Sequence, residues 1–379
     1  MKIAIISPGP FTVPPVKGSS VEHDIDEVSK ELARNHHVII YSRKSNAFPH
    51  SQQKGNIHYI RVKYKGADDY IRRIADDLTN QNPDVILIEN RPLYVPTVRK
   101  KMPKTPIILN MHSHVFASSY HISPHKMQKV TKQIDAMITN SEFLRKYYID
   151  EHMINESKVH AVHLGVQLEP YARAAFSPEV GEIRNKFRIT HDERVLFFAG
   201  RIMKEKGIHL LIKGFRTIAM NDPRARLVIV GGTGYGSNRK NAYVRYLHQL
   251  AKPVKNRVTF VNFVPSKKMP IYYQLADVVA TPSVWKEAFC RVNLEAMAAG
   301  KPVISSTQGG ISEVIINEET GILIPVNKWV DDLPEWWRLM WSRKYIQQEM
   351  SRRAYLRARQ LNWGATAEGY LRVFYSCLT

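Results

Sequence analysis

Short apolar runs alternate with longer amphipathic stretches along most of the chain. In the first half, the apolar runs predict buried strands at residues 2–6, 37–41, 58–62, 84–88, 106–110, 136–139 and 159–162. The stretch from Val21 to Arg34 is predicted to be a helix, because Val21, Ile25, Val28 and Leu32 fall on one apolar face. This regular alternation of strands and helices is typical of an α/β fold built on parallel sheets.

A second series of apolar runs begins near residue 194. Its members are the segments RVLFFAG, RLVIVGG, VTFVNF, VVATP, PVISS and GILIP. The stretch 165–192 between the two series is rich in turn-forming and charged residues, and we interpret it as a linker. A chain of 379 residues is too long for one ordinary core and suits two domains of comparable size. We therefore expect domains at 1–168 and 169–362, followed by a closing helix from Trp363 to Leu378.

The composition is ordinary for a globular protein, with 44% hydrophobic and 23% charged residues. The two cysteines, Cys290 and Cys377, are too few for a disulfide framework, so the sequence favours a reducing compartment. The apolar run after Lys2 ends at Pro8-Gly9-Pro10 and is predicted to be a buried strand, not part of a signal peptide. Because no apolar run has the length of a membrane-spanning helix, we expect a soluble, cytoplasmic protein.

The charge balance is unusual, because 55 Lys and Arg residues against 34 Asp and Glu residues give a formal net charge of +21. This surplus predicts an anionic partner, either a membrane surface or a polymer, with a solvated basic face as the alternative. Nucleic acid is the poorer choice, because no helix-turn-helix, zinc-finger or RNP-type pattern accompanies the charge. The clustered basic residues are Arg99, Lys100, Lys101, Lys104, Lys126, Lys129, Lys132, Arg338, Arg343, Lys344, Arg352, Arg353, Arg357 and Arg359.

Residues 282–313 contain the most informative pattern of the chain. Glu287 lies in a predicted loop, and Glu295, eight positions later, lies about a turn into the helix that follows. The first turn of a helix presents unpaired N–H groups and the positive end of the dipole, which together suit a diphosphate. A carboxylate before that junction can accept hydrogen bonds from sugar hydroxyls, and one within the helix can accept from a ribose diol. The pattern therefore predicts a nucleotide-sugar site, whose junction residues are Ala288, Phe289, Cys290 and Arg291.

The same stretch closely resembles the E-x7-E donor signature of family 4 glycosyltransferases, which have the GT-B fold. The resemblance covers nearly the whole chain and includes MKIAIIS with the loop Lys17-Gly18-Ser19, AGRIMKEKG at 199–207, and FVPSKKMPIYYQLADVVATPS at 263–283. Within the family, GGTGYGSNRKNAYVRYLHQLA followed by KNRVTFVNFV is similar to the pattern of the spore coat protein SA group. The resemblance implies two Rossmann-like domains facing each other across a cleft, with residues 363–379 crossing back to the first.

The activity implied by the resemblance is retaining transfer of a sugar from a nucleoside diphosphate, with UDP favoured, to an acceptor hydroxyl. The acceptor would be a glycan, a lipid-linked molecule or a protein, and the family suggests a role in spore coat or cell-surface glycan synthesis, peripheral at the inner membrane or the spore surface. No cofactor and no metal are expected. A structural spore coat protein with a vestigial site is the main alternative, and a nucleotide-sugar epimerase is another. Measuring nucleoside diphosphate release with and without acceptor would separate them.

Arg201 and Lys206 follow a predicted strand and its terminal Gly200, at the edge where open parallel sheets bind ligands. The resemblance implies that this pair stabilises the departing nucleoside diphosphate, whereas a surface pair capping the next helix is the alternative. Glu287 resembles the residue that contacts the donor sugar, and Glu295 the residue that binds ribose. The other donor-binding candidates carried over from the family are Gly18, Gly200, Phe263, Val264, Ala288, Phe289, Cys290, Arg291, Gly309 and Gly310.

His112 follows the run PIILN, and the resemblance places it near the anomeric region of the donor. The family usually has His-Asp at this point, where this chain has His112-Ser113-His114. The alternatives are a buried structural histidine and a His-x-His metal site, for which no third ligand is evident. Asp24-Ile25-Asp26 spells D-x-D, a metal motif of the other major glycosyltransferase fold. In a helix these two side chains point apart, so we expect no metal there.

Overall fold

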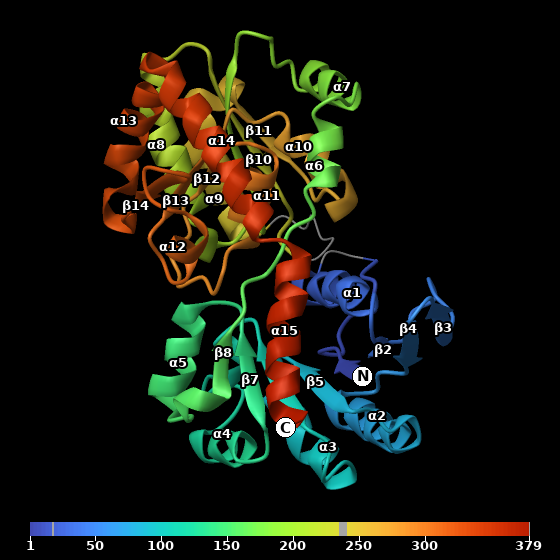
Figure 1. Cartoon of the computed structure of the whole chain (residues 1–379). Helices are drawn as coiled ribbons and strands as arrows, with labels where there is room; N and C mark the ends of the chain where they lie inside the picture. The colour runs from blue at the N-terminus through green and yellow to red at the C-terminus, as the bar shows by residue number, and fades with distance from the viewer. Residues whose placement is uncertain (17–18, 235–240, 379) are drawn as a thin grey trace. The chain divides into compact units, whose positions relative to one another are not determined.

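The computed structural model describes residues 1–16, 19–234 and 241–378, which form two compact units (Figure 1). The first unit consists of Met1–Gly165 together with the C-terminal helix, and the second of Val166–Asn362. Each unit is a mostly parallel sheet with helices packed against it. Within the described residues, every helix is too short or too polar to cross a lipid bilayer.

In its described part, the first unit contains an eight-stranded sheet in the order β3-β4-β2-β1-β5-β6-β7-β8. The pairs are parallel except for β3, which runs antiparallel to β4 at the edge. The strands are β1 (Lys2–Ile6), β2 (His37–Arg43), β3 (Ser51–Lys54), β4 (Ile57–Val62), β5 (Val85–Glu89), β6 (Ile107–Met111), β7 (Ala136–Thr139) and β8 (Val159–Ala161). The helices are α1 (Ser20–Leu32), α2 (Ala67–Gln81), α3 (Val95–Lys101), α4 (Pro124–Thr131), α5 (Glu142–His152) and α15 (Trp363–Leu378), with 3-10 turns η1 (Pro92–Tyr94), η2 (Val115–Ala117) and η3 (Glu156–Lys158).

The described part of the second unit contains a six-stranded parallel sheet in the order β11-β10-β9-β12-β13-β14. The strands are β9 (Arg194–Ala199), β10 (Ala225–Val230), β11 (Val258–Val261), β12 (Val278–Thr281), β13 (Val303–Ser306) and β14 (Gly321–Ile324). The α-helices are α6 (Glu169–Ala174), α7 (Glu179–Lys186), α8 (Ile208–Asn221), α9 (Ala242–Ala251), α10 (Met269–Tyr273), α11 (Arg291–Ala298), α12 (Ile311–Val314), α13 (Trp329–Ser342) and α14 (Lys344–Gln360). The 3-10 turns are η4 (Lys204–Lys206), η5 (Lys252–Arg257), η6 (Ser266–Lys268) and η7 (Val326–Lys328).

The core of the second unit lies between its sheet and the apolar faces of helices α8 and α13. Phe215 of α8 and Trp329 of α13 are fully buried, and so are Leu196 and Ile229 of the sheet. Burying a side chain of this size stabilises the fold by about 1.5–3 kcal/mol relative to leaving it in water. Apart from the half-buried edge strand β11, the strands are almost entirely buried, which explains their near-continuous apolar sequences.

The strand order reverses once in each sheet. In the first unit, the chain builds outward from β1 through β2 and later returns to the other side of β1 with β5. In the second unit, the same reversal occurs between β9 and β12. Open parallel sheets bind ligands at the carboxyl ends of the strands beside such a reversal, because the loops there diverge and leave room. These two edges are therefore where functional side chains are expected.

The strands and the helix predicted in the first half are confirmed to within a few residues, as are the apolar runs of the second half. The interpretation of 165–192 as a linker is wrong, because this stretch contains α6 and α7 and belongs to the second unit. The side chain of Gln274 donates to the carbonyl of Tyr171 at 3.0 Å, which attaches α6 to the body of that unit. The first boundary lies between Gly165 and Val166, three residues before the expected one, and helix α15 packs in the first unit.

Candidate functional site

In the second unit, a half-buried Lys206 and a buried Glu287 form an ion pair at the carboxyl edge beside the strand reversal. Lys206 ends the turn η4 that follows β9, and Glu287 lies in the loop between β12 and α11. The Lys206 ammonium is 2.5 Å from Oε1 of Glu287, and the Ser283 hydroxyl donates to the same oxygen at 2.6 Å. Glu287 is 6% exposed. The two loops on either side of the reversal are thus joined through one carboxylate.

The surroundings of Glu287 keep it ionised. Burial alone would raise its pKa, but the charge and hydrogen bond of Lys206 and the hydroxyl of Ser283 outweigh burial and hold the pKa below its usual value. Because the pKa of Glu287 is lower in the folded than in the unfolded state, the pair stabilises the fold fully above the unfolded pKa. This stability is lost as the pH falls through the folded pKa. At neutral pH the site therefore presents a fixed carboxylate as a hydrogen-bond acceptor.

Two glycines with positive φ allow these loops to approach each other. A Cβ on Gly309 would lie 2.1 Å from the carbonyl oxygen of Glu287, and Gly310 donates its N–H to that oxygen at 2.8 Å. A Cβ on Gly207 would lie 1.8 Å from the carbonyl oxygen of Pro282. Their φ angles, +69° and +68°, are also ones that side chains disfavour. Gly309 therefore fixes the backbone of Glu287 from one side.

Glu295 lies in α11 with partners on both carboxylate oxygens. The hydroxyl of Tyr273, a buried residue of α10, donates to Oε2 at 2.9 Å, and the Arg291 guanidinium is 3.5 Å from Oε1. Burial and the nearby Glu295 raise the pKa of Tyr273 well above its usual value, so this phenol keeps its proton as the donor. The orientation of the Glu295 side chain is therefore set before any ligand binds.

Cys290 is the residue before α11 and adopts the left-handed conformation, with φ +62°. Burial, followed by the charge of Glu287, raises the pKa of its thiol to about 12. A neutral, buried thiol is a poor nucleophile at pH 7, because the thiolate is the reactive form. Its neighbour Phe289 is 2% exposed and packs in the core, while Ala288 continues the loop from Glu287.

The remaining candidates of the second unit also follow strands of its sheet. Gly200 and Arg201 directly follow β9, and Phe263 and Val264 lie in the loop after β11. The structure thus brings together Glu287, Lys206, Gly309 and Gly310 by direct contact. Gly18, the candidate in the loop after β1, lies outside the described residues.

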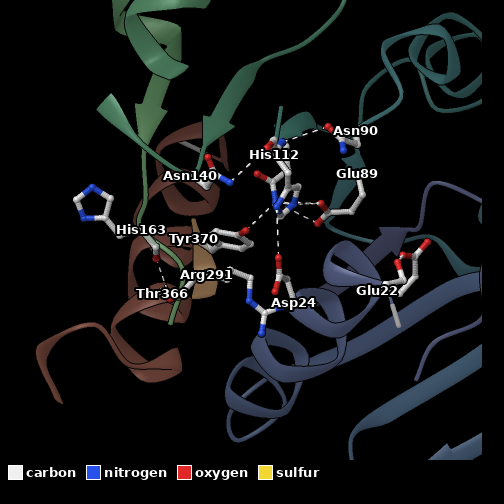
Figure 2. A network of polar contacts seen from close by, with 12 residues as sticks. Glu22, Asp24, Glu89, Asn90, His112, Asn140, His163, Arg291, Thr366 and Tyr370 are labelled. Atoms are coloured by element: carbon white, nitrogen blue, oxygen red, sulfur yellow. Dashed lines mark hydrogen bonds and ion pairs between the residues drawn. The ribbon is translucent and has the colours of Figure 1, made fainter. Parts of the chain in front are cut away.

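In the first unit, His112 follows β6 and lies between two carboxylates from other elements (Figure 2). Its Nε2 is 2.8 Å from Oε2 of Glu89, the last residue of β5, and its Nδ1 is 3.6 Å from Oδ2 of Asp24 in α1. The backbone N–H of His112 donates to Oδ1 of Asn90 at 3.1 Å. The His112 side chain is 7% exposed. Its ring therefore makes a hydrogen bond at Nε2, while Nδ1 lies near the Asp24 carboxylate without a hydrogen bond to it.

The two motifs considered for metal binding diverge in the structure. Asp26 accepts from the Tyr59 hydroxyl at 3.0 Å and pairs with Lys30 at 2.8 Å, whereas Asp24 faces His112. The ring of His114 packs against Tyr147, with the centroids 5.5 Å apart, away from the partners of His112. The expected divergence of Asp24 and Asp26 within one helix is confirmed.

Comparison with known proteins gives the family. A model of "Glycosyl transferases group 1" matches residues 179–357, and one of "Glycosyltransferase Family 4" matches residues 21–170. The protein YtcC of Bacillus subtilis (strain 168) is 32% identical over 86% of this chain and 79% of YtcC. Spore coat protein SA of the same strain is 31% identical over 86% of this chain and 85% of that protein. The chain belongs to the family 4 glycosyltransferases.

The fold of this family 4 glycosyltransferase is GT-B. The crystal structure of Anabaena Alr3699/HepE in complex with UDP-glucose covers 99% of this chain and 100% of its own, with a TM-score of 0.79 and 19% sequence identity. At this level of identity the likeness shows the fold alone. The expected architecture of two Rossmann-like parallel-sheet domains is therefore confirmed, and so is the likeness to the spore coat protein SA group.

Several residues around the candidate sites of this glycosyltransferase were not found from the sequence. Ser283 and Tyr273 hold the two glutamates of the E-x7-E signature, and Glu89 and Asp24 hold His112. The available signal was weak: Glu89 is an acid that ends an otherwise apolar strand, and Asp24 is an acid on a helix. A charged residue at the carboxyl end of a buried strand next to a strand reversal is therefore a candidate site residue.

Proposed function

We propose that this glycosyltransferase moves a sugar from a UDP-sugar to an acceptor hydroxyl with retention of the anomeric configuration. The observation that carries the proposal is the buried carboxylate of Glu287, held by Lys206 and Ser283 beside the strand reversal of the second unit. UDP is favoured because the coat protein group suggests it and because a neighbour of the same fold was crystallised with UDP-glucose.

Each residue of the second unit has a role in this proposal. Glu287 accepts hydrogen bonds from the sugar hydroxyls, and Glu295 accepts from the ribose diol. The diphosphate is neutralised by Arg201, Lys206 and the N-terminal end of α11, where the helix dipole is positive. Lys206 has three N–H donors, so it can hold a phosphate oxygen while it remains paired with Glu287. The acceptor attacks on the face that the diphosphate leaves, and a diphosphate oxygen takes the acceptor proton.

Positioning and charge stabilisation supply the catalysis in this mechanism. Because the acceptor attacks the sugar directly, no side chain has to act as a covalent nucleophile, in keeping with the neutral thiol of Cys290. The acceptor proton goes to the leaving diphosphate. We extend the proposal to independence from divalent metal, because two cations and a helix terminus already face the diphosphate. His112 of the first unit acts near the anomeric centre by family resemblance.

The proposal is tested by following UDP release and the anomeric configuration of the product with NMR. We expect UDP to bind more tightly than GDP or ADP in calorimetry, and UDP release to depend on an acceptor and to continue in excess EDTA. An inverted product, tighter GDP binding, or loss of activity on chelation that Mg²⁺ restores would each contradict one part of the proposal. A protein that binds the donor but never releases UDP with any acceptor would favour the vestigial coat protein.

The surplus positive charge is partly neutralised within the fold. Arg99 pairs with Asp135 at 2.6 Å, and Arg352 and Arg353 share Glu349, each at 2.7 Å. In contrast, the described residues provide no carboxylate pair for the exposed lysines of α4 and its C-terminus, namely Lys126, Lys129 and Lys132. Tyr120, just before α4, is 90% exposed. We define these four residues as the α4 surface, and we propose that it binds an anionic membrane.

Sedimentation with anionic liposomes tests the α4 surface. We expect binding at low salt that disappears at high salt, because each Lys near such a surface contributes about 1 kcal/mol and is screened beyond about 8 Å at physiological ionic strength. The triple variant Lys126→Ala, Lys129→Ala, Lys132→Ala should lose most of this binding. The control is Arg352→Ala with Arg353→Ala, which removes two cations that are already paired. Equal loss in both variants would show that only the net charge matters.

A further inference from the structure

Glu89, Asp24 and His112 form a charged cluster in the interior of the first unit, which we call the His112 cluster (Figure 2). We propose that Glu89 and Asp24 are positioning residues that hold His112 as an imidazolium, and that Tyr370 of the C-terminal helix keeps Glu89 in place through Asn110. Where it concerns transfer, this inference rests on the proposed role of His112 near the anomeric centre.

Each ring nitrogen of His112 has a carboxylate beside it. Nε2 is at hydrogen-bond distance from Glu89, 2.8 Å, and is also 3.2 Å from the side-chain nitrogen of Asn110. Nδ1 has no hydrogen bond and is at ion-pair distance from Asp24, 3.6 Å. A neutral imidazole has one N–H, so one nitrogen would present its lone pair to a carboxylate inside the fold. Only the imidazolium presents N–H groups to both. Glu89 therefore acts through a hydrogen bond and charge, and Asp24 through charge.

Glu89 is oriented by a residue from the far end of the chain. The side-chain nitrogen of Asn110 lies 3.2 and 3.0 Å from the two oxygens of Glu89 and donates to the Tyr370 hydroxyl at 2.6 Å. Tyr370 is buried in α15, and burial followed by the charge of Glu89 raises its pKa well above the usual value. The phenol thus stays neutral, and α15 forms part of the support of His112.

The carboxylates around His112 all favour its protonated form. Burial alone would lower the pKa of His112, but the hydrogen bond with Glu89 and the charges of Glu89, Asp24 and Glu22 outweigh burial and raise it. Glu22 is the other acid of α1 near the ring; its own pKa is raised by burial, and Arg91 is its cationic neighbour. Tyr370, the titratable group facing the cluster from α15, is neutral.

The consequence is a pH-dependent support of the loop after β6. Since the folded pKa of His112 is raised, the stability that its charge contributes is fully present below the unfolded pKa of about 6.5 and is lost as the pH rises through the folded value. Above that point Glu89 and Asp24 would remain buried without their shared cation. The ring would then keep a single N–H for the two carboxylates, while the backbone N–H of His112 stays bonded to Asn90.

The titration of His112 by side-chain NMR tests the proposal without an activity assay. The variant His112→Gln identifies the His112 resonance among the 15 histidines. We expect a midpoint above the ordinary value in the wild type, and a midpoint lower by about one to three pH units in Glu89→Gln, which removes a charge next to the ring. The matched control is Asp26→Asn, which removes a buried charge from α1, the helix of Asp24. Asp26 pairs with Lys30 and Tyr59.

A wild-type midpoint at or below the ordinary value, or equal shifts in Glu89→Gln and Asp26→Asn, would overturn the proposal. Tyr370→Phe should shift the midpoint in the same direction by less, and no shift would remove α15 from the support. The pH dependence of the transfer rate on the alkaline side is measured in parallel. If the NMR midpoint moves and this pH dependence does not, the positioning of His112 stands and its role in transfer fails. If His112→Gln loses transfer and Glu89→Gln leaves the midpoint unchanged, the role stands and this inference fails.

Discussion

Replacing Lys206 with alanine is expected to lower the rate of transfer by roughly 100- to 1000-fold, the effect typical of losing one preorganised charge donor. The variant also leaves the carboxylate of Glu287 buried without its cation, and we expect a loss of about 3 kcal/mol in the free energy of unfolding. Because the Lys206 charge keeps the pKa of Glu287 low, that pKa should rise in the variant. Transfer then decreases over a wider range of acidic pH. Steady-state kinetics between pH 5 and pH 8 and urea unfolding measure both effects.

The control for this prediction is Lys204→Ala. Lys204 lies two residues earlier in the same turn, η4, and its side chain is exposed, so its loss changes the net charge equally without breaking the buried pair. We expect wild-type transfer and wild-type stability. The double variant Lys206→Met with Glu287→Gln separates the two effects, because it removes the unpaired buried charge and should recover stability while transfer stays low. Near wild-type turnover of Lys206→Ala would show that Lys206 does not contact the diphosphate.

The positions of the buried strands along the chain could be predicted from the sequence because each is a short, nearly uninterrupted apolar run. The edge strand β3 could not, since Ser51–Lys54 is polar and is defined by pairing with β4 alone. Helices α6 and α7 were missed for a related reason. They are short, begin near prolines and have few buried residues, so their sequence has the composition of a linker. Both helices contact α10, and α6 buries Tyr171 and Ala174.

In the candidate sites, too, some residues could be predicted from the sequence and others could not. Glu287, Lys206 and Glu295 were predicted because the E-x7-E pattern and the cations after β9 have a fixed spacing in the chain. The partners of His112 come from β5, α1 and α15, and no spacing links Asp24, Glu89 and Tyr370. Asp24 and Asp26 diverge on helix α1 as expected, but helical periodicity could not show which residues each side chain faces. Glu89 comes close to His112 because β5 and β6 are neighbours in the sheet, and the sequence alone does not give this strand order.

Replacing Gly309 with alanine is expected to lower the free energy of unfolding by about 4 kcal/mol or more, the range of an exceptional single substitution. Two costs add at this position. A side chain disfavours φ +69°, and the new Cβ would lie 2.1 Å from the carbonyl oxygen of Glu287, so the backbone of that residue has to move. A displacement of about 1 Å at a reacting group can cost roughly 100-fold in rate. Transfer should therefore fall with stability, as measured by urea unfolding and by UDP release far below the melting temperature.

Gly300→Ala isolates the second cost from the first. Gly300 follows α11 with nearly the same angle, φ +67°, and a Cβ there would have no heavy atom within 4 Å apart from those of its two chain neighbours. This control should lose only the backbone contribution, about 1–2 kcal/mol, and keep wild-type transfer. The difference between the two variants then measures the contact between Gly309 and Glu287. Equal stabilities and equal rates in Gly309→Ala and Gly300→Ala would mean that the loop of Glu287 moves aside easily, and that its position is set by Lys206 and Ser283 instead.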